Sequence, residues 1–208
     1  IVGAFLFAPL FMGVFGGQIV GLNVLCYALL LALAFRHGMS ADVLSGVVAG
    51  IWMVKPHYGL AAVTVLICER RWMACISWSV VTAILWALGA LVAGVNWVSG
   101  WLAFARHFAE IDLVTNAHQM TGIVPTLYSV AVKLGLSLSP SGWELFATSA
   151  ALLVPAGILI ATRYERSRKA TPGGALLFLG PLLIIFAPMV NFYDLSLGLV
   201  PLMAIFRP

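Results

Sequence analysis

The sequence predicts an all-α, polytopic transmembrane helical bundle with about six to seven membrane segments, one of which is re-entrant or broken. The first observation is composition: of 208 residues, 62% are hydrophobic and 9% are charged, and the mean hydropathy is +1.07. Soluble domains carry about 25% charged residues, and a chain of 22.2 kDa has too little interior to hide so much apolar surface. The second observation is that long apolar runs alternate with short loops that hold most of the Lys and Arg residues. These features exclude a cytosolic enzyme, a nucleic-acid-binding module and a secreted disulfide scaffold.

A spanning helix needs about 20 mostly apolar residues, and several runs of the chain approach this length. In order, the runs are Ile1–Val14, Ile19–Phe35, Val43–Cys68, Trp72–Gly94, Trp143–Thr162, Gly174–Val190 and Leu195–Phe206. The fourth run is uninterrupted, and the fifth starts at Ser141-Gly142-Trp143-Glu144, which fits a capping box. We expect residues 1–208 to form a single transmembrane domain that is an internal piece of a longer protein.

The third run is interrupted in its middle by Lys55-Pro56-His57, and two topologies follow from this break. As a re-entrant hairpin with Lys55 at its tip, the run leaves eight of the 11 Lys and Arg residues on the cytoplasmic side. If the third run instead crosses the membrane once, Arg36 lies on the extracytoplasmic side and seven of these residues remain cytoplasmic. The positive-inside rule therefore favours the hairpin by one residue, and both topologies place residues 95–142 and 191–194 on the extracytoplasmic side.

Residues 95–142 form the long polar-leaning stretch of the chain. Aromatic residues recur there at helical spacing, as expected of a helix that lies flat in the headgroup region; these are Trp97, Trp101, Phe104 and Phe108. The alternative is an ordinary loop with scattered aromatic residues. Thr126–Leu134 forms a second candidate interfacial helix after Pro125. Glu110 and Asp112 fit either a general base or, more simply, the solvated face of the interfacial helix.

Lys55 is the polar residue that is least expected inside an apolar run. A lysine at the bilayer centre costs about 2.5–3.5 kcal/mol, so it usually faces a ligand, a carboxylate or a protein-lined cavity. The positions three and four residues away on either side hold no acidic side chain. The simpler interpretation is a lysine that snorkels from a helix end. The sharper interpretation is an anion ligand, with Pro56 breaking the helix beside it, and a lipid phosphate is the anion available at this depth.

Other polar groups give weaker signals. Gly16-Gly17-Gln18 opens the second run and offers backbone amides to an anion or a sugar hydroxyl. Asp194 follows Tyr193 beside the last run and fits either a site or a boundary carboxylate in water. The histidines and cysteines lack metal-ligand spacing, so we expect no metal site, and no nucleophile or nucleotide motif is present in the sequence.

Taken in order, these short motifs resemble the bacterial branch of glycosyltransferase family 87. The residues that carry the resemblance are Gly17-Gln18-Ile19, Ala49-Gly50, Lys55-Pro56-His57-Tyr58-Gly59-Leu60, Arg70-Arg71-Trp72, Trp97, Trp101-Leu102, Pro188 and Tyr193-Asp194-Leu195. Two positions depart from the family pattern: Val20 stands where Asn is frequent, and His57 replaces the usual Gln.

The resemblance implies a GT-C fold and inverting transfer of a mannose-like hexose from a polyprenyl-phosphate donor to a glycan or glycolipid acceptor. Lys55 would hold the donor phosphate, and Gln18, His57, Tyr193 and Asp194 would line the cavity. The implied location is the bacterial inner (plasma) membrane, with the active site facing the extracytoplasmic side. The general base of GT-C enzymes normally lies in the first outer loop, which implies a base outside this chain and leaves the catalytic residue unassigned.

Two rival functions remain at the level of the sequence. A transporter or lipid flippase also binds an anionic substrate at a broken helix, but the two halves of the chain show no inverted repeat. A non-catalytic membrane subunit would equally lack a general base. The expected partners are the lipid bilayer, a lipid-linked sugar donor and a glycan or glycolipid acceptor. Nucleic acid is not expected as a partner.

Overall fold

A computed structural model of the chain describes residues 19–36, 38–100, 102–103, 153–164, 175–176, 179–182, 197–198 and 200. Over these residues the predicted all-α class is confirmed. The elements are α3 (Val20–Ala34), α4 (Met39–Ile51), the 3-10 helix η1 (Trp52–Val54), α5 (Pro56–Cys68) and α6 (Trp72–Ala93), followed by a helix over Leu153–Tyr164. The run Ile1–Val14 and most of the last two runs lie outside the described residues, so the predicted number of membrane segments stays a prediction.

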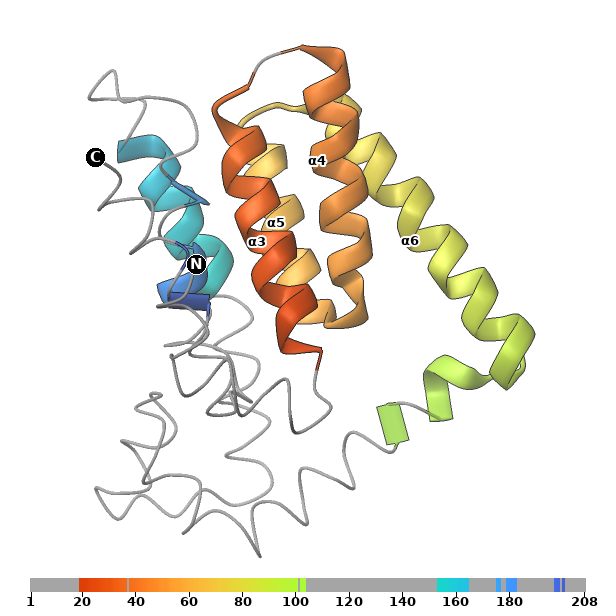
Figure 1. Ribbon diagram of the computed structural model, residues 1–208. Helices are drawn as coiled ribbons and strands as arrows, with labels where there is room; N and C mark the ends of the chain where they lie inside the picture. Colours follow the sequence, from red (N-terminus) through yellow and green to blue (C-terminus); the bar gives the residue numbers. More distant parts are fainter. Residues whose placement is uncertain are drawn as a thin grey trace, which may run out of the picture.

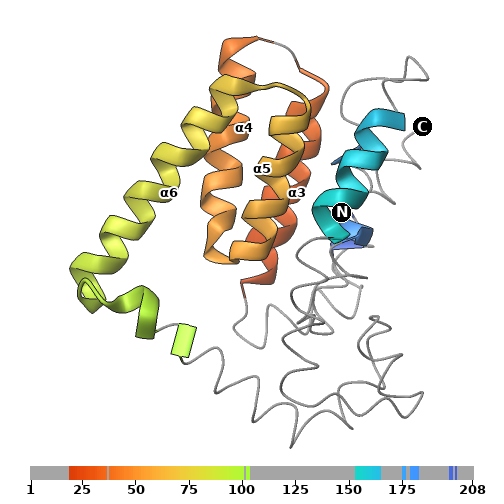
Figure 2. The ribbon, with the colours of Figure 1, turned by 180° about the vertical axis from the view of Figure 1, so that it is seen from behind.

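Helices α3, α4 and α5 stand side by side as an up-down-up bundle, and α6 leaves the bundle at an angle (Figures 1 and 2). With 13 to 15 residues each, these three helices are only about 20 Å long, which is less than the hydrocarbon core of about 30 Å. Helix α6, with 22 residues, is the one helix of the described part that is long and apolar enough to cross a membrane. Its start and end match the predicted run Trp72–Gly94.

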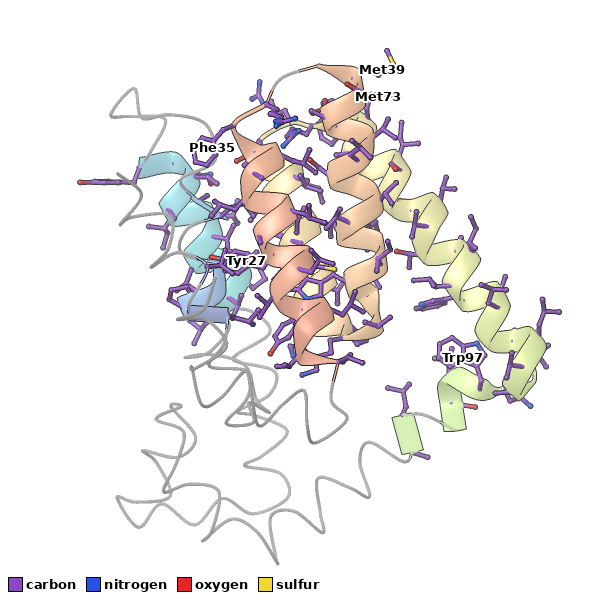
Figure 3. All side chains as sticks on the ribbon, in the orientation of Figure 1. Tyr27, Phe35, Met39, Met73 and Trp97 are labelled. Carbon is purple, nitrogen blue, oxygen red and sulfur yellow. The ribbon has the colours of Figure 1, made fainter. Side chains whose placement is uncertain are left out.

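The chain folds back on itself between α4 and α5, as the hairpin topology requires. The Nε of Arg71, just after α5, donates to a carboxylate oxygen of Asp42, in the first turn of α4, at 2.6 Å. The two ends of the hairpin are therefore adjacent. Figure 3 shows Phe35, Met39 and Met73 at this same end of the bundle. A single crossing would put Arg36 and Arg71 at opposite ends, so the structure contradicts that alternative.

Helix α5 ends in a Schellman motif. The backbone N–H of Arg71 donates to the carbonyl of Leu66 and that of Arg70 donates to Ile67, both at 3.0 Å. Arg70 occupies the left-handed position of this motif, with φ of 59°, where glycine is the usual residue. The tight turn aims Arg71 back at Asp42 and starts α6 directly.

Helices α4 and α6 pack through a seam of small residues. Gly46 and Gly50 lie one turn apart on α4, and a Cβ atom at Gly46 would collide with the backbone carbonyl of Ala74. At Gly50, an added Cβ would lie 2.6 Å from the Cβ of Val81. The close approach also lets the Ser77 hydroxyl donate to the carbonyl of Val43 at 3.0 Å. This is the small-xxx-small packing typical of membrane helices.

Helix α3 packs between the α4–α5 hairpin and described segments of the C-terminal part of the chain. The hydroxyl of Tyr27 donates to the Leu176 carbonyl at 2.6 Å and accepts from the Gly180 N–H at 3.0 Å. Figure 3 shows Tyr27 on the side of α3 that faces the helix over 153–164. Tyr27 and Ile158 are fully buried in one apolar core. The C-terminal segments thus close the bundle on the side opposite α6.

The end of α6 turns sharply at Gly94, which has φ of 86°. Trp97 then packs back onto α6, edge-on to Trp86 with 6.1 Å between ring centroids. A Cβ added at Gly89 would lie 2.8 Å from the Trp97 indole. Residues 97–100 and 102–103 are helical, as the interfacial helix requires at its start. The remainder of the predicted helix, and Thr126–Leu134, lie outside the described residues.

Candidate functional site

The site is built at the tip of the α4–α5 hairpin, and its backbone follows from the Lys-Pro pair. Proline disfavours helical backbone at the preceding residue, and Lys55 accordingly adopts an extended conformation, with φ of −118° and ψ of 94°. Pro56 then occupies the first turn of α5, where its missing N–H costs nothing. Lys55 is thereby the N-cap residue of α5, and its carbonyl accepts from the N–H of Tyr58 at 2.9 Å.

The Lys55 side chain is half-buried and lies over an aromatic ring. Its ammonium nitrogen is 5.2 Å from the centroid of the Tyr58 ring, within cation–π distance. The N-terminus of α5 adds the positive end of a helix dipole beside this cation. Two sources of positive potential therefore coincide at the tip, which favours an anion such as a phosphate.

Beneath Lys55 three aromatic side chains are in continuous contact. Trp52 is fully buried between Tyr27 and Tyr58, with ring centroids 5.9 Å and 5.4 Å away respectively. The indole N–H of Trp52 donates to the side-chain oxygen of Asn23 at 3.2 Å. Because Tyr58 and Asn23 are also buried, the turn that carries Lys55 rests on a fixed aromatic and amide layer.

Gly59 allows η1 and α5 to approach each other. A Cβ atom at Gly59 would lie 2.6 Å from the sulfur of Met53 and 2.9 Å from its backbone nitrogen. Any larger residue would push η1 away from α5 and widen the turn at Lys55.

His57, predicted to line the site, lies in the first turn of α5 and is half-buried. Its ring packs edge-on against Tyr58, with 4.2 Å between centroids. The structure therefore brings His57 and Lys55 together on one tyrosine. The other predicted lining residues, Gln18, Tyr193 and Asp194, lie outside the described residues.

Sequence reasoning missed Asn23 as part of this layer. A buried amide in an apolar run carries the same type of signal that singled out Lys55, because polar groups inside a membrane segment are costly. Its partner, Trp52, gave no signal, since a tryptophan in an apolar run resembles any core residue.

The opposite end of the hairpin has a different chemistry. It holds the Asp42–Arg71 ion pair, together with Glu69 and Arg70, while exposed Arg36 follows α3 at the same end. Within the described ranges, no group of three His, Cys, Asp or Glu side chains gathers to hold a metal ion.

A comparison with protein-family models finds glycosyltransferase family 87 over residues 1–190. The chain belongs to glycosyltransferase family 87. The resemblance to family 87 drawn from the short motifs is thus confirmed, and the protein is a transferase of a membrane family. No curated protein and no solved structure matches the chain.

Membership of family 87 gives the hairpin a chemical context. A glycosyltransferase needs a sugar donor and an acceptor, and the match includes α3, the hairpin and α6. The Lys55 tip is the place in the described structure where a cation, a helix N-terminus and an aromatic layer meet.

Proposed function

We propose that this family 87 protein transfers a mannose-like hexose, with inversion, from a polyprenyl-phosphate donor to a glycan or glycolipid acceptor outside the cytoplasm. Lys55 binds the donor phosphate. The observation that carries the proposal is the position of the Lys55 ammonium at the N-terminus of α5, over the Tyr58 ring, at the tip of a membrane-family hairpin.

The depth of the tip supports a lipid-linked donor. An arm of 13 residues that starts at one membrane surface reaches about 20 Å into a hydrocarbon core of about 30 Å. Lys55 then lies about 10 Å below the far surface, from where its flexible side chain extends toward the headgroup region. The phosphate of a polyprenyl lipid occupies that region.

The charge distribution supports an extracytoplasmic site. Arg36, Arg70 and Arg71 gather at the end of the bundle opposite Lys55, and the positive-inside rule assigns such an end to the cytoplasm. The Lys55 tip then faces the other compartment, on the same side as residues 95–142.

In the reaction, an acceptor hydroxyl oxygen attacks the anomeric carbon while the bond from that carbon to the phosphate oxygen breaks. The polyprenyl phosphate leaves with the electron pair and gains one negative charge, and the hydroxyl proton passes to a general base. Lys55 stabilises the developing charge on the leaving phosphate, an effect that is strong in a site shielded from water. The cavity-lining roles of Gln18, His57, Tyr193 and Asp194 belong to the same proposal.

The test is binding of farnesyl-phosphoryl-mannose to the full-length protein in lipid nanodiscs, measured by native mass spectrometry, with farnesol as the neutral control. Loss of a charge-assisted hydrogen bond costs about 1.5–3 kcal/mol, so Lys55→Gln should weaken binding by about tenfold to hundredfold. Lys55→Arg, which keeps the charge, should retain most of the affinity. Arg36→Gln removes a positive charge from the opposite end of the bundle and should leave the affinity for farnesyl-phosphoryl-mannose unchanged.

Two results would contradict the proposal. Equal affinity of wild type and Lys55→Gln would remove Lys55 from the donor site. If the wild-type protein does not bind farnesyl-phosphoryl-mannose and binds inorganic phosphate instead, the result would favour an anion transporter.

A further inference from the structure

Asn23 is an unusual residue for its place in the fold. It lies in the first turns of α3, has no exposed surface, and is surrounded by a core that is otherwise mainly apolar. Its side-chain oxygen accepts from the Trp52 indole. Its amide nitrogen is buried and makes no hydrogen bond within the part of the chain that is described.

A buried amide with an unpaired nitrogen destabilises a fold, because the group has lost water without gaining a partner. The unpaired nitrogen therefore offsets part of what the hydrogen bond from Trp52 contributes to stability. The hydrogen bond from Trp52 also has a geometric consequence, since a directional bond to a buried amide restricts the rotation of the indole ring.

Trp52 is connected to Lys55 through a short series of contacts. Trp52 is the first residue of η1, and the Lys55 N–H donates to its carbonyl at 3.1 Å. The Trp52 ring also packs against the Tyr58 ring, over which the Lys55 ammonium lies. Backbone and ring contacts thus both link Trp52 to the predicted phosphate ligand.

We infer that Asn23 is a positioning residue of the transferase site: through its hydrogen bond to Trp52, it sets the place of the Lys55 ammonium at the hairpin tip. The inference rests on the proposed role of Lys55 in phosphate binding. Asn23 contacts neither donor nor acceptor and is not a catalytic residue.

The test measures the ratio of the affinities for farnesyl-phosphoryl-mannose and farnesol, which reports the contribution of the phosphosugar headgroup. In Asn23→Leu, a variant of similar volume, we expect this ratio to fall by about threefold to tenfold, in the lower part of the range for coupled neighbours. Farnesol affinity should stay at the wild-type value. The melting temperature should change little, because removing the unpaired amide nitrogen offsets the cost of leaving the buried Trp52 indole N–H without an acceptor.

Four further variants separate positioning from simple structural damage. Trp52→Phe removes the indole N–H, and the double variant Asn23→Leu/Trp52→Phe should lower the ratio no further than Trp52→Phe does. Tyr27→Phe keeps the ring that packs on Trp52 and removes only a hydroxyl that bonds to Leu176 and Gly180. It should therefore lower the melting temperature while leaving the ratio unchanged. If Asn23→Leu does not fold, Asn23→Thr removes the same amide and keeps a hydroxyl that can bond to its own helix.

The outcomes distinguish this inference from the proposed function. If Lys55→Gln loses the headgroup preference and Asn23→Leu (or Asn23→Thr) keeps it, the positioning role is wrong while the phosphate site stands. An Asn23 variant that loses affinity for both ligands together with thermal stability would also overturn it. If the wild type shows no preference for the phosphosugar over farnesol, both the positioning role of Asn23 and the phosphate site at Lys55 are wrong.

Discussion

The small-residue seam between α4 and α6 gives the sharpest stability prediction. Replacing Gly46 by Ala places a methyl group against the Ala74 carbonyl and 2.7 Å from the Ser77 Cβ. Neither atom is at the end of a flexible side chain, so the two helices must separate. Gly21 is the matched control, because it also lies in a helix but has no atom of the described residues within 4 Å of an added Cβ.

The size of the effect follows from the geometry. Gly46→Ala gains helix propensity of about 1 kcal/mol at most, and Gly21→Ala, in the first turn of α3, gains no more than that. Only Gly46→Ala adds overpacking, which costs about 1–3 kcal/mol, and it weakens the Ser77 to Val43 hydrogen bond of 3.0 Å, worth about 0.6 kcal/mol in a membrane protein. We therefore expect Gly46→Ala to be about 2–3 kcal/mol less stable than Gly21→Ala.

The assay is reversible unfolding in mixed micelles as the fraction of sodium dodecyl sulfate is raised, followed by circular dichroism. Ser77→Ala serves as a second control, since it removes the hydrogen bond alone and should cost less than 1 kcal/mol or so. A Gly46→Ala variant within about 0.5 kcal/mol of Gly21→Ala would refute the packing argument, because surface substitutions vary by that amount.

Two further predictions concern the two ends of the hairpin. Gly59→Ala should cost about 1–3 kcal/mol and weaken farnesyl-phosphoryl-mannose binding, since the new methyl lies 2.9 Å from the Met53 backbone nitrogen; stability equal to that of Gly21→Ala would contradict it. Asp42→Ala should cost about 1–3 kcal/mol because the Arg71 guanidinium, with 11% of its side chain exposed, then loses its carboxylate. The double variant Asp42→Ala/Arg71→Met should recover part of that loss in the same assay, and a double variant less stable than Asp42→Ala would argue against the ion pair.

Local physics made several elements readable from the sequence. The runs Ile19–Phe35 and Trp72–Gly94 correspond closely to α3 and α6, because apolar composition and polar boundaries mark membrane helices. The break at Lys55-Pro56 follows from the backbone restrictions of proline. The ordered short motifs also identified the family that the comparison confirmed.

Which faces of these helices contact each other could not be predicted from the sequence. Helices α3 and α6 are apolar on all sides, so no amphipathic stripe shows which residues meet which. The sequence therefore gave no sign that Gly46 would face Ala74, or that Asn23 would accept a hydrogen bond from a residue 29 positions later.

Composition and local backbone preference thus determined on their own that the chain is a helical membrane protein with a broken third segment and a lysine at the break. The tertiary structure decided that this segment folds back, because the Asp42–Arg71 ion pair and the Schellman turn join its ends. It also decided that Lys55 lies over Tyr58 on a layer fixed by Trp52 and Asn23. These contacts depend on helix rotation and crossing, which only packing between residues distant in sequence can set.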